Sequence, residues 1–257
     1  MDMVSGGATI NIMLAGVLAE GTTIIDNAAK EPHIVDVANF LNTMGADIRG
    51  AGTDTIKING VKQLKGGQSY SVVPDQIEAG TFMLGAVASR GDLIIKNCVP
   101  EHLECITAKI LEIGGNVEIN GDSIHVWCNT KPNKANVKTL PYPGFPTDLQ
   151  PQIGVVLSLA DGTSIINESI WESRFQYTAE LNKMGADVTQ INSNKVVVSG
   201  KKILEGTTIE AKDLRGGASL VLAGLIAHGT TTVKNIHFID RGYEHLEEVL
   251  TKLGANI

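Results

Sequence analysis

The stretch 20-EGTTIIDNAAKEPHIVDVANFLNTMGAD-47 opens and closes on short motifs that both return later in the chain. The opening Gly-Thr motif at Gly21 recurs at intervals of 70, 71 and 67 residues, at Gly91, Gly162 and Gly229. The closing motif lies 23 to 25 residues after each of these glycines, at Gly45, Gly114, Gly185 and Gly254. Two motifs that recur in step predict four structural repeats of about 70 residues.

The first repeat shows which elements each repeat should contain. The run 12–19 is apolar on nearly all sides, which predicts a buried helix that ends at the Gly-Thr motif. The other elements follow in order: a β-branched strand at 23–26, an amphipathic helix at 34–41 that ends near Gly45, and a hairpin from 46–48 and 55–58. The sequence therefore predicts an α/β fold with the order helix, strand, helix, strand, strand.

Composition limits the possible functions. The 257 residues are 43% hydrophobic and 19% charged, enough for one large or two medium domains with real cores. The net charge of −7 and the lack of a basic stripe argue against nucleic-acid binding. No apolar run is long enough to span a membrane, and the N-terminus lacks a signal pattern. Three cysteines without a C-x-x-C pair fit a reducing cytoplasm and indicate neither disulfides nor structural zinc.

Both ends of the chain fall inside a repeat. Residues 1–7 lead directly into the first apolar helix, and Ile257 stops where the first hairpin strand of the fourth repeat should begin. We therefore expect a truncated piece of a longer protein. Because missing strands leave open sheet edges, we also expect self-association or a compensating strand from another chain.

Aligning the repeats on their Gly-Thr glycines singles out Asp148. Sixteen residues before these glycines lie Ser5, Asp75, Pro146 and Asp213, and fourteen before lie Gly7, Ile77, Asp148 and Arg215. Ser and Asp in the first slot are ordinary helix N-caps. The second slot holds a carboxylate in one repeat and a guanidinium in another, a variation that a shared folding requirement would not produce. Asp148 is thus a candidate for chemistry, with helix capping as the alternative.

Arginines are the other candidates. The N-termini of the apolar helices attract anions, and Arg215 lies at one of them beside Gly216 and Gly217. These glycines let a ligand approach the backbone or serve close packing. Arg174 and Arg241 begin the outer helices of the third and fourth repeats, and each is an anion ligand or a solvated surface charge.

The sequence signals neither a metal site nor a nucleophile. The six histidines are scattered without a ligand-like pair, so we interpret them as surface or packing residues. The cysteines Cys98, Cys105 and Cys128 lie in strand or helix contexts without a glycine-rich loop, which favours structural roles. We expect no metal and no other cofactor.

Two segments are distinctive, 144-GFPTDLQPQ-152 and the Asp-Leu-Arg of residues 213–215, and the segments 5–36, 50–61, 213–231 and 239–257 extend the same pattern. Together they resemble the UDP-N-acetylglucosamine 1-carboxyvinyltransferases, the enolpyruvyl transferases that commit UDP-N-acetylglucosamine to peptidoglycan synthesis. The resemblance implies the enolpyruvyl-transferase fold, an inside-out α/β barrel of β-α-β-α-β-β units. It makes residues 1–72 the last repeat of the first, catalytic-loop domain and residues 73–257 most of the second domain.

The resemblance also implies roles for individual residues in a cleft between the two domains. Asp148 matches the aspartate that binds the sugar nucleotide and accepts the proton of its 3-hydroxyl, to which the enolpyruvyl group of phosphoenolpyruvate is transferred. Arg215, Arg241 and Arg174 match arginines of the anion-binding cleft. The remaining matches are sugar-nucleotide contacts: Met3, Val4, Ser5, Gly6 and Ile170. No metal is required.

Two departures from the family pattern affect the expected activity. Met3 stands where a basic residue is common, and Gly6 stands where a small apolar residue is usual. The family's Lys-Asn pair and its loop with the reactive cysteine and following arginine would lie upstream of Met1, so we expect this chain alone to be inactive. Two alternatives remain: a non-catalytic sugar-nucleotide-binding protein, and the shikimate-pathway enolpyruvyl transferase, which would bind shikimate 3-phosphate instead.

Overall fold

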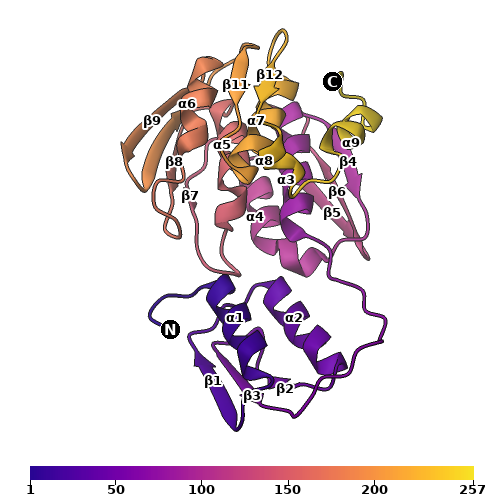
Figure 1. Ribbon diagram of the computed structural model, residues 1–257. Helices are drawn as coiled ribbons and strands as arrows, with labels where there is room; N and C mark the ends of the chain where they lie inside the picture. The colour runs from indigo at the N-terminus through magenta and orange to yellow at the C-terminus, as the bar shows by residue number, and fades with distance from the viewer. The chain divides into compact units, whose positions relative to one another are not determined.

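A computed structural model describes all residues from 1 to 257 (Figure 1). The chain divides into two compact units. The N-terminal unit contains Met1–Pro74 together with Pro141–Gly144, and the C-terminal unit contains Asp75–Leu140 and Phe145–Ile257. Each unit has its own hydrophobic core, and each is built from the repeats that the glycine motifs predict.

The N-terminal unit holds the first repeat. Its elements are α1 (Gly6–Gly16), β1 (Thr22–Asp26), α2 (Pro32–Thr43), β2 (Asp47–Arg49) and β3 (Thr55–Asn59). The strands form an antiparallel sheet in the order β1-β3-β2, so the last strand is the central one. Ile56 and Ile58 of β3 are fully buried against the helices, while Thr55 and Lys57 point to solvent. The predicted order of helix, strand, helix, strand, strand is confirmed.

The C-terminal unit repeats this plan twice in full. The second repeat contains α3 (Gln76–Ser89), β4 (Asp92–Ile95), η1 (Pro100–Leu103), α4 (Glu104–Glu112), β5 (Asn116–Asn120) and β6 (Ser123–Trp127). The third contains β7 (Val137–Lys138), η2 (Thr147–Leu149), α5 (Gln150–Ser158), β8 (Thr163–Asn167), α6 (Gln176–Lys183), β9 (Asp187–Asn192) and β10 (Lys195–Ser199). Their sheets run β4-β6-β5 and β7-β8-β10-β9. The short parallel strand β7 completes the β-α-β-α-β-β order that the resemblance implies.

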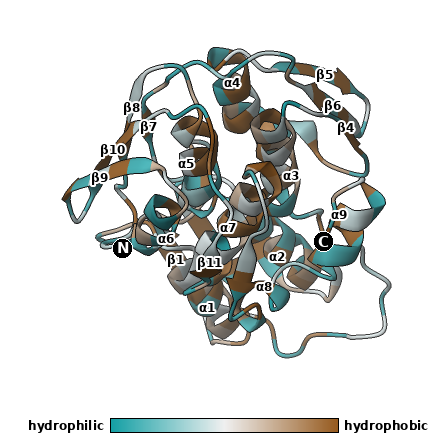
Figure 2. Cartoon of the chain, turned by 90° about the horizontal axis from the view of Figure 1, so that it is seen from above, coloured by the Kyte–Doolittle hydropathy of each residue, from teal (hydrophilic) through white to brown (hydrophobic).

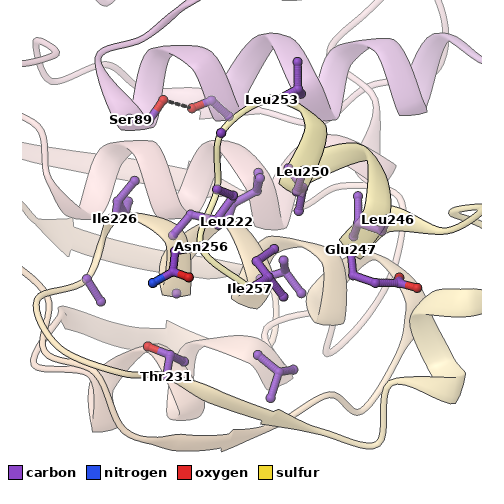
Figure 3. Close-up of a pocket in the computed structure, with 18 of the residues that line it drawn as sticks. Ser89, Leu222, Ile226, Thr231, Leu246, Glu247, Leu250, Leu253, Asn256 and Ile257 are labelled. Carbon is purple, nitrogen blue, oxygen red and sulfur yellow. Dashed lines mark hydrogen bonds between the residues drawn. The ribbon is translucent and has the colours of Figure 1, made fainter.

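The fourth repeat ends differently. It contains β11 (Thr208–Glu210), α7 (Leu214–Ile226), β12 (Thr232–Lys234), α8 (His237–Asp240) and α9 (Leu246–Lys252). Strand β12 pairs only with β11, in parallel. Residues 1–257 provide no central third strand for this repeat, and an apolar groove lies beside β12 (Figure 3).

The apolar helices of the C-terminal unit pack against one another. Helices α3, α5 and α7 are in mutual contact, and all nine residues of α5 are buried. Figure 2 shows these three hydrophobic helices side by side, with the strands of the second and third repeats outside them. Their association explains why each helix is apolar on nearly all sides.

The prediction of a buried first helix is wrong for α1. Ile12 and Leu14 are 36% and 48% exposed, and only Thr9, Met13 and Gly16 of this helix are buried. The reason is that the N-terminal unit contains one helix of this kind, so α1 packs against α2 and the sheet along one side without partners like α3 and α5.

The glycine motifs mark positions that need left-handed backbone. Gly21, Gly162 and Gly229 have φ values of +89°, +107° and +89°, and the second series at Gly45, Gly114, Gly185 and Gly254 is left-handed throughout. In the second repeat the left-handed residue is Arg90, one position before Gly91, where it ends α3. Only glycine takes this conformation without steric cost, which accounts for the recurrence of both motifs.

Candidate functional site

Asp148 lies in the 3₁₀ turn η2, immediately before the buried helix α5. Its side chain does not cap the helix. One carboxylate oxygen, Oδ1, accepts a hydrogen bond from Nη2 of Arg174 at 2.8 Å, and the other, Oδ2, accepts from Nε of Arg215 at 3.1 Å. Asp148 and Arg215, which occupy equivalent positions in the third and fourth repeats, thus form an ion pair with each other. The carboxylate forms a charge-assisted link between the third and fourth repeats.

The two arginines reach Asp148 from different elements. Arg174 lies in the turn before α6, and its Nη1 donates to Oγ1 of Thr147 at 2.7 Å. Arg215 is the second residue of α7, whose N-cap is Asp213. The Arg215 guanidinium lies 5.5 Å from the centre of the Tyr243 ring, and its buried Nη1 has no hydrogen-bond partner. One donor of this arginine is therefore uncommitted.

The charge of Asp148 is set by two opposing effects. Burial raises the pKa of this carboxyl, but Arg174 and Arg215 lower it by more, so the pKa lies below its usual range. The side chain retains 35% of its exposure. Asp148 is therefore an anion at neutral pH, partly open to solvent and able to accept a proton.

Glu168, a residue that the sequence does not single out, is linked to Arg174 through the hydroxyl of Thr147. Its side chain is almost fully buried, and its carboxylate accepts hydrogen bonds from the Thr139 and Thr147 hydroxyls at 2.6 and 2.9 Å. The backbone N–H groups of Ile170 and Trp171 also donate to it. Thr147 in turn accepts from Arg174. Because Glu168 simply follows a strand, no local motif singles it out.

The starts of the three buried helices meet near this cluster. Gln152 of α5 donates to Thr81 of α3 and to the Tyr243 hydroxyl, and Thr81 and Tyr243 are themselves hydrogen-bonded at 2.8 Å. Burial raises the pKa of Glu78 in the first turn of α3, and Asp75 and Glu244 raise it further. These hydrogen bonds join α3 and α5 near their N-termini, where unpaired N–H groups and helix dipoles favour anions.

Two other candidates in the C-terminal unit form no hydrogen bond or ion pair with Asp148, Arg174 or Arg215. Arg241 directly follows α8 and is exposed. Ile170 is 38% exposed, and its backbone N–H donates to Glu168. Gly217 serves packing, because an added Cβ would lie 2.7 Å from Cγ1 of Ile239.

The candidates of the N-terminal unit cluster at the start of α1. Met3 is 78% exposed and Val4 is half-buried. Ser5 is the N-cap of α1, and its Oγ accepts a hydrogen bond from the Ala8 N–H at 3.3 Å. A Cβ at Gly6 would meet His33 and Ile34 only at ordinary contact distances, so packing does not require glycine there. This helix start is open to an anion.

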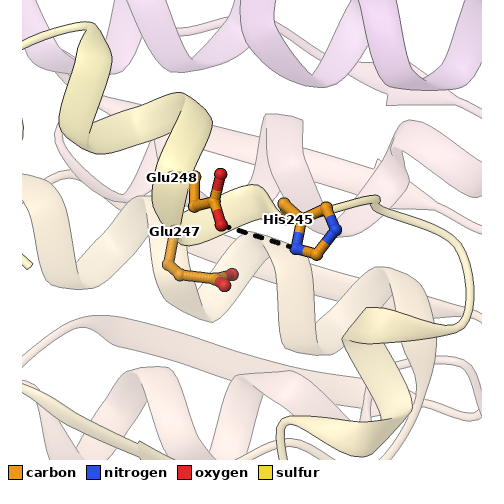
Figure 4. Close-up of side chains that lie close together, drawn as sticks. All are labelled: His245, Glu247 and Glu248. Carbon is orange, nitrogen blue, oxygen red and sulfur yellow. Dashed lines mark ion pairs between the residues drawn. The ribbon is translucent and has the colours of Figure 1, made fainter.

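One side-chain group has the composition of a metal site. The potential ligand atoms of His245, Glu247 and Glu248 lie within 4.8 Å of one another at the start of α9 (Figure 4). All three side chains are exposed, and Glu248 already pairs with His245 at 3.8 Å and with Lys252 at 3.9 Å. This is the pattern of a solvated helix surface, and we assign no ion to it.

The cysteines are free, and two of them lie in surroundings that make their thiols less acidic. Burial raises the pKa of the Cys98 and Cys105 thiols, which keeps them protonated and poorly nucleophilic. Both observations support structural roles.

No helix in the chain has the length and apolar character needed to cross a bilayer.

The lowered pKa of Asp148 predicts a specific loss of stability in acid. Because the folded-state pKa lies below the unfolded value of about 3.9, this carboxylate stabilises the fold above about pH 4 and stops doing so as the pH falls through the folded value. We expect the stability difference between the wild type and Asp148→Asn to shrink between pH 5 and 2. Urea unfolding at several pH values measures it, and a pH-independent difference would contradict the prediction.

Comparisons with known proteins agree on one family. The model of the family EPSP synthase (3-phosphoshikimate 1-carboxyvinyltransferase) matches residues 1–250. The UDP-N-acetylglucosamine 1-carboxyvinyltransferase of Clostridium botulinum (strain ATCC 19397 / Type A) is 54% identical over 256 residues, which cover 100% of this chain and 61% of the relative. A protein of Caldanaerobacter subterraneus subsp. tengcongensis, UDP-N-acetylglucosamine 1-carboxyvinyltransferase 3, is 55% identical with the same coverage. The chain thus spans about three fifths of the curated relatives it matches.

Solved structures confirm the predicted fold. The enolpyruvyl transferase NikO from Streptomyces tendae superposes with a TM-score of 0.89 at 29% identity, covering 98% of this chain and 60% of that one. An EPSP synthase from Acinetobacter baumannii, at 22% identity, has a TM-score of 0.73 and covers 97% and 60% of the two chains, so its likeness concerns the fold alone. The family model matches residues 1–250 of the 257 residues in this chain. The chain therefore belongs to the EPSP synthase family of 1-carboxyvinyltransferases.

Proposed function

We propose that this chain is part of an enolpyruvyl transferase and carries Asp148 of its active site. The enzyme would transfer the enolpyruvyl group of phosphoenolpyruvate to UDP-N-acetylglucosamine, the first committed step of peptidoglycan synthesis. Two kinds of finding support the proposal. The relatives at 50–55% identity are named UDP-N-acetylglucosamine 1-carboxyvinyltransferase. The observation that carries the chemistry is the partly exposed Asp148 carboxylate, which two arginines hold in its anionic form.

The geometry suits a proton acceptor beside an anion site. In the net transfer, the sugar 3-hydroxyl oxygen forms a bond to C2 of phosphoenolpyruvate, the C2–O bond to phosphate breaks, and the hydroxyl proton must go to a base. Asp148 is that base in this proposal. A phosphate or carboxylate that bound Arg174 or Arg215 would draw their charge away from Asp148, which would raise its pKa and make it a better base.

In this proposal the other candidate residues contact the substrates. The buried Nη1 of Arg215, which has no hydrogen-bond partner, and the exposed guanidinium of Arg241 would donate to anionic groups. Met3, Val4, Ser5 and Gly6 would contact the nucleotide diphosphate at the start of α1, and Ile170 would contact the sugar nucleotide. The expected assignment of residues 1–72 and 73–257 to two domains, the inactivity of the isolated chain and its self-association stay predictions. The three free cysteines favour a cytoplasmic location.

Calorimetry with two ligands tests the substrate class. We expect UDP-N-acetylglucosamine to bind and shikimate 3-phosphate not to bind. Arg174→Met should weaken binding by about tenfold or more, because a charge-assisted hydrogen bond is worth about 1.5–3 kcal/mol. Arg90→Met, which removes an exposed arginine at the far end of α3, should leave the affinity unchanged.

Other outcomes would identify the alternatives. Binding of shikimate 3-phosphate with no response to UDP-N-acetylglucosamine would favour the shikimate-pathway enzyme, which the structures support at the level of fold alone. Binding of the sugar nucleotide by a complete protein that shows no phosphate release with phosphoenolpyruvate would favour a non-catalytic binding protein. If Arg174→Met and Arg90→Met reduced the affinity for UDP-N-acetylglucosamine equally, the assignment of Arg174 to the binding site would be wrong.

A further inference from the structure

Tyr243 is a buried tyrosine in the segment between α8 and α9, and its ring faces Arg215. It is 2% exposed, although the neighbouring Arg241 and Glu244 are exposed. The centre of its ring lies 5.5 Å from Cζ of Arg215, a distance at which an aromatic face attracts a guanidinium. Nε of Arg215 donates to Oδ2 of Asp148 at 3.1 Å. The guanidinium is therefore held at two places, by a carboxylate at one edge and by the tyrosine ring.

The hydroxyl of Tyr243 is fixed by side chains from two other repeats. Thr81 of α3 donates its single hydroxyl proton to the Ile77 carbonyl at 2.8 Å. In the 2.8 Å contact between the Thr81 and Tyr243 hydroxyls, Tyr243 must therefore be the donor. The Tyr243 oxygen accepts from Nε2 of Gln152 in α5 at 3.3 Å, and the same amide donates to Thr81 at 3.1 Å. The ring thus cannot turn away from Arg215 without breaking two buried hydrogen bonds.

This network is not arranged for stability alone. Thr81 and Gln152 are at most 1% exposed. Oε1 of Gln152 and Nη1 of Arg215 are buried without a hydrogen-bond partner. Buried polar atoms without partners cost stability, and well-packed apolar side chains in the same space would avoid that cost. Departures of this kind are typical of functional sites. What the network provides is a single position for the Tyr243 ring.

We propose that Tyr243 is a positioning residue that holds the Arg215 guanidinium against Asp148, and that Thr81 and Gln152 hold Tyr243 in turn. The inference rests on the proposed function, because it takes Arg215 to be a ligand of the anionic substrate. Thr81 belongs to the second repeat, Gln152 to the third, and Tyr243 and Arg215 to the fourth. The packing of three repeats against one another therefore sets the direction in which Nη1 of Arg215 points.

Two substitutions at Tyr243 separate the ring from the hydroxyl. Tyr243→Phe keeps the ring and loses the bonds to Thr81 and Gln152, whereas Tyr243→Leu loses both the ring and the hydroxyl. Calorimetry measures the affinity of each variant for UDP-N-acetylglucosamine. We expect binding to weaken about tenfold in Tyr243→Leu and about threefold in Tyr243→Phe, because the first loses the cation–π contact and the second loses only its anchor. Circular dichroism confirms that both variants fold.

Tyr177→Phe is the matched control. Tyr177 is 3% exposed, and its hydroxyl accepts from Nε2 of Gln150 in α5 at 3.3 Å. The change therefore again removes a buried hydroxyl that is bonded to a glutamine of this helix, but the ring of Tyr177 does not face Arg215. We expect Tyr177→Phe to lose stability in urea unfolding and to keep the affinity of the wild type. An equal loss of affinity in Tyr177→Phe and Tyr243→Phe would overturn the proposal.

A double variant shows whether Tyr243 acts through Arg215. Arg215→Met removes the guanidinium that the ring holds. If positioning of this arginine is the role of Tyr243, then adding Tyr243→Leu to Arg215→Met should weaken binding no further. A second loss as large as the one that Tyr243→Leu causes alone would mean that the tyrosine acts by another route, and the proposal would be wrong.

The titration of the Asp148 carboxyl gives a readout that needs no ligand. Burial raises the pKa of Asp148, and the charges of Arg174 and Arg215 lower it by more. Asp75 and Glu78 are the other carboxyls that act on Arg215. Because a guanidinium that is held less firmly lowers the pKa of Asp148 less, Tyr243→Leu should make this carboxyl about tenfold less acidic. Carbon-13 NMR of the Asp148 carboxyl measures the change.

The two readouts distinguish failure of this inference from failure of the proposed function. If UDP-N-acetylglucosamine does not bind to the wild type, the proposed function is wrong, and the titration alone decides the role of Tyr243. An Asp148 titration that is the same in a folded Tyr243→Leu as in the wild type, or that shifts equally in Tyr177→Phe, would show that Tyr243 does not position Arg215. A shift in Tyr243→Leu alone would support the positioning role whatever the ligand.

Discussion

Gly60→Ala is expected to destabilise the N-terminal unit by more than about 3 kcal/mol, a cost at the upper end of the range for overpacking. Gly60 directly follows β3, and its N–H donates to the Gly21 carbonyl at 2.9 Å. An added Cβ would lie 1.6 Å from the Ala19 carbonyl oxygen and 2.7 Å from its carbon. Because the obstacle is the backbone of the segment that follows α1, no side-chain rotation relieves it. Urea unfolding monitored by circular dichroism measures the loss.

Gly7→Ala is the matched control. It makes the same chemical change within α1 of the same unit, where an added Cβ has no atom within 4 Å. Alanine in an open helical position stabilises by up to about 1 kcal/mol relative to glycine. Similar unfolding curves for the two variants would show that the backbone near Ala19 yields more easily than the structure indicates.

The repeats explain where this constraint applies. Gly200 in the third repeat has the same environment, with its Cβ position 1.7 Å from the Ala160 carbonyl oxygen. In the second repeat the corresponding residue is Cys128, whose N–H donates to the Gly91 carbonyl. There α3 continues to Ser89 and ends on the left-handed Arg90, so the helix end follows another path and leaves room for a side chain.

Much of the fold could be predicted from the sequence because its constraints are local. A left-handed residue after each helix calls for glycine, so Gly21 and Gly45 and their equivalents reveal the period of the repeats. The alternation in residues 55–58 likewise gives the buried face of β3. The burial of α1 could not be predicted, because an apolar surface does not specify which element covers it. Helices α3, α5 and α7 cover one another, and α1 has no such partner within its unit.

The candidate site was only partly predictable for the same reason. Asp148 and Arg215 are conspicuous in an alignment of repeats because each is an exception at a shared position, and the structure joins them in an ion pair. Thr147 and Glu168 have ordinary neighbours in sequence, and their importance arises from contacts between segments about twenty residues apart. Arg241 resembles Arg174 in its position within the repeat, yet it remains exposed and makes no ion pair with Asp148, because α8 ends just before it.

Glu168→Gln is expected to weaken UDP-N-acetylglucosamine binding by about tenfold, although Glu168 is buried behind the site. Its carboxylate accepts four hydrogen bonds, and one of them orients the Thr147 hydroxyl so that it can accept from Arg174. An amide in its place directs an NH₂ group at hydroxyl and N–H donors and removes the charge from bonds worth about 1.5–3 kcal/mol each. Arg174 would then lose one of the two contacts that hold it. Calorimetry gives the affinity, and urea unfolding should show a loss of stability of about 2 kcal/mol or more.

Thr147→Val separates orientation from general destabilisation. This variant preserves the Glu168 carboxylate and its three other donors, and it removes the hydroxyl that links Glu168 to Arg174. If orientation of Arg174 is what matters, Thr147→Val should reduce affinity nearly as much as Glu168→Gln while costing less stability. Loss of stability with full affinity in both variants would limit Glu168 to a role in folding. Arg174→Met can also be combined with each of these two variants. If the double variants bind no more weakly than the single ones, Thr147, Glu168 and Arg174 act through one chain of contacts that ends at Asp148.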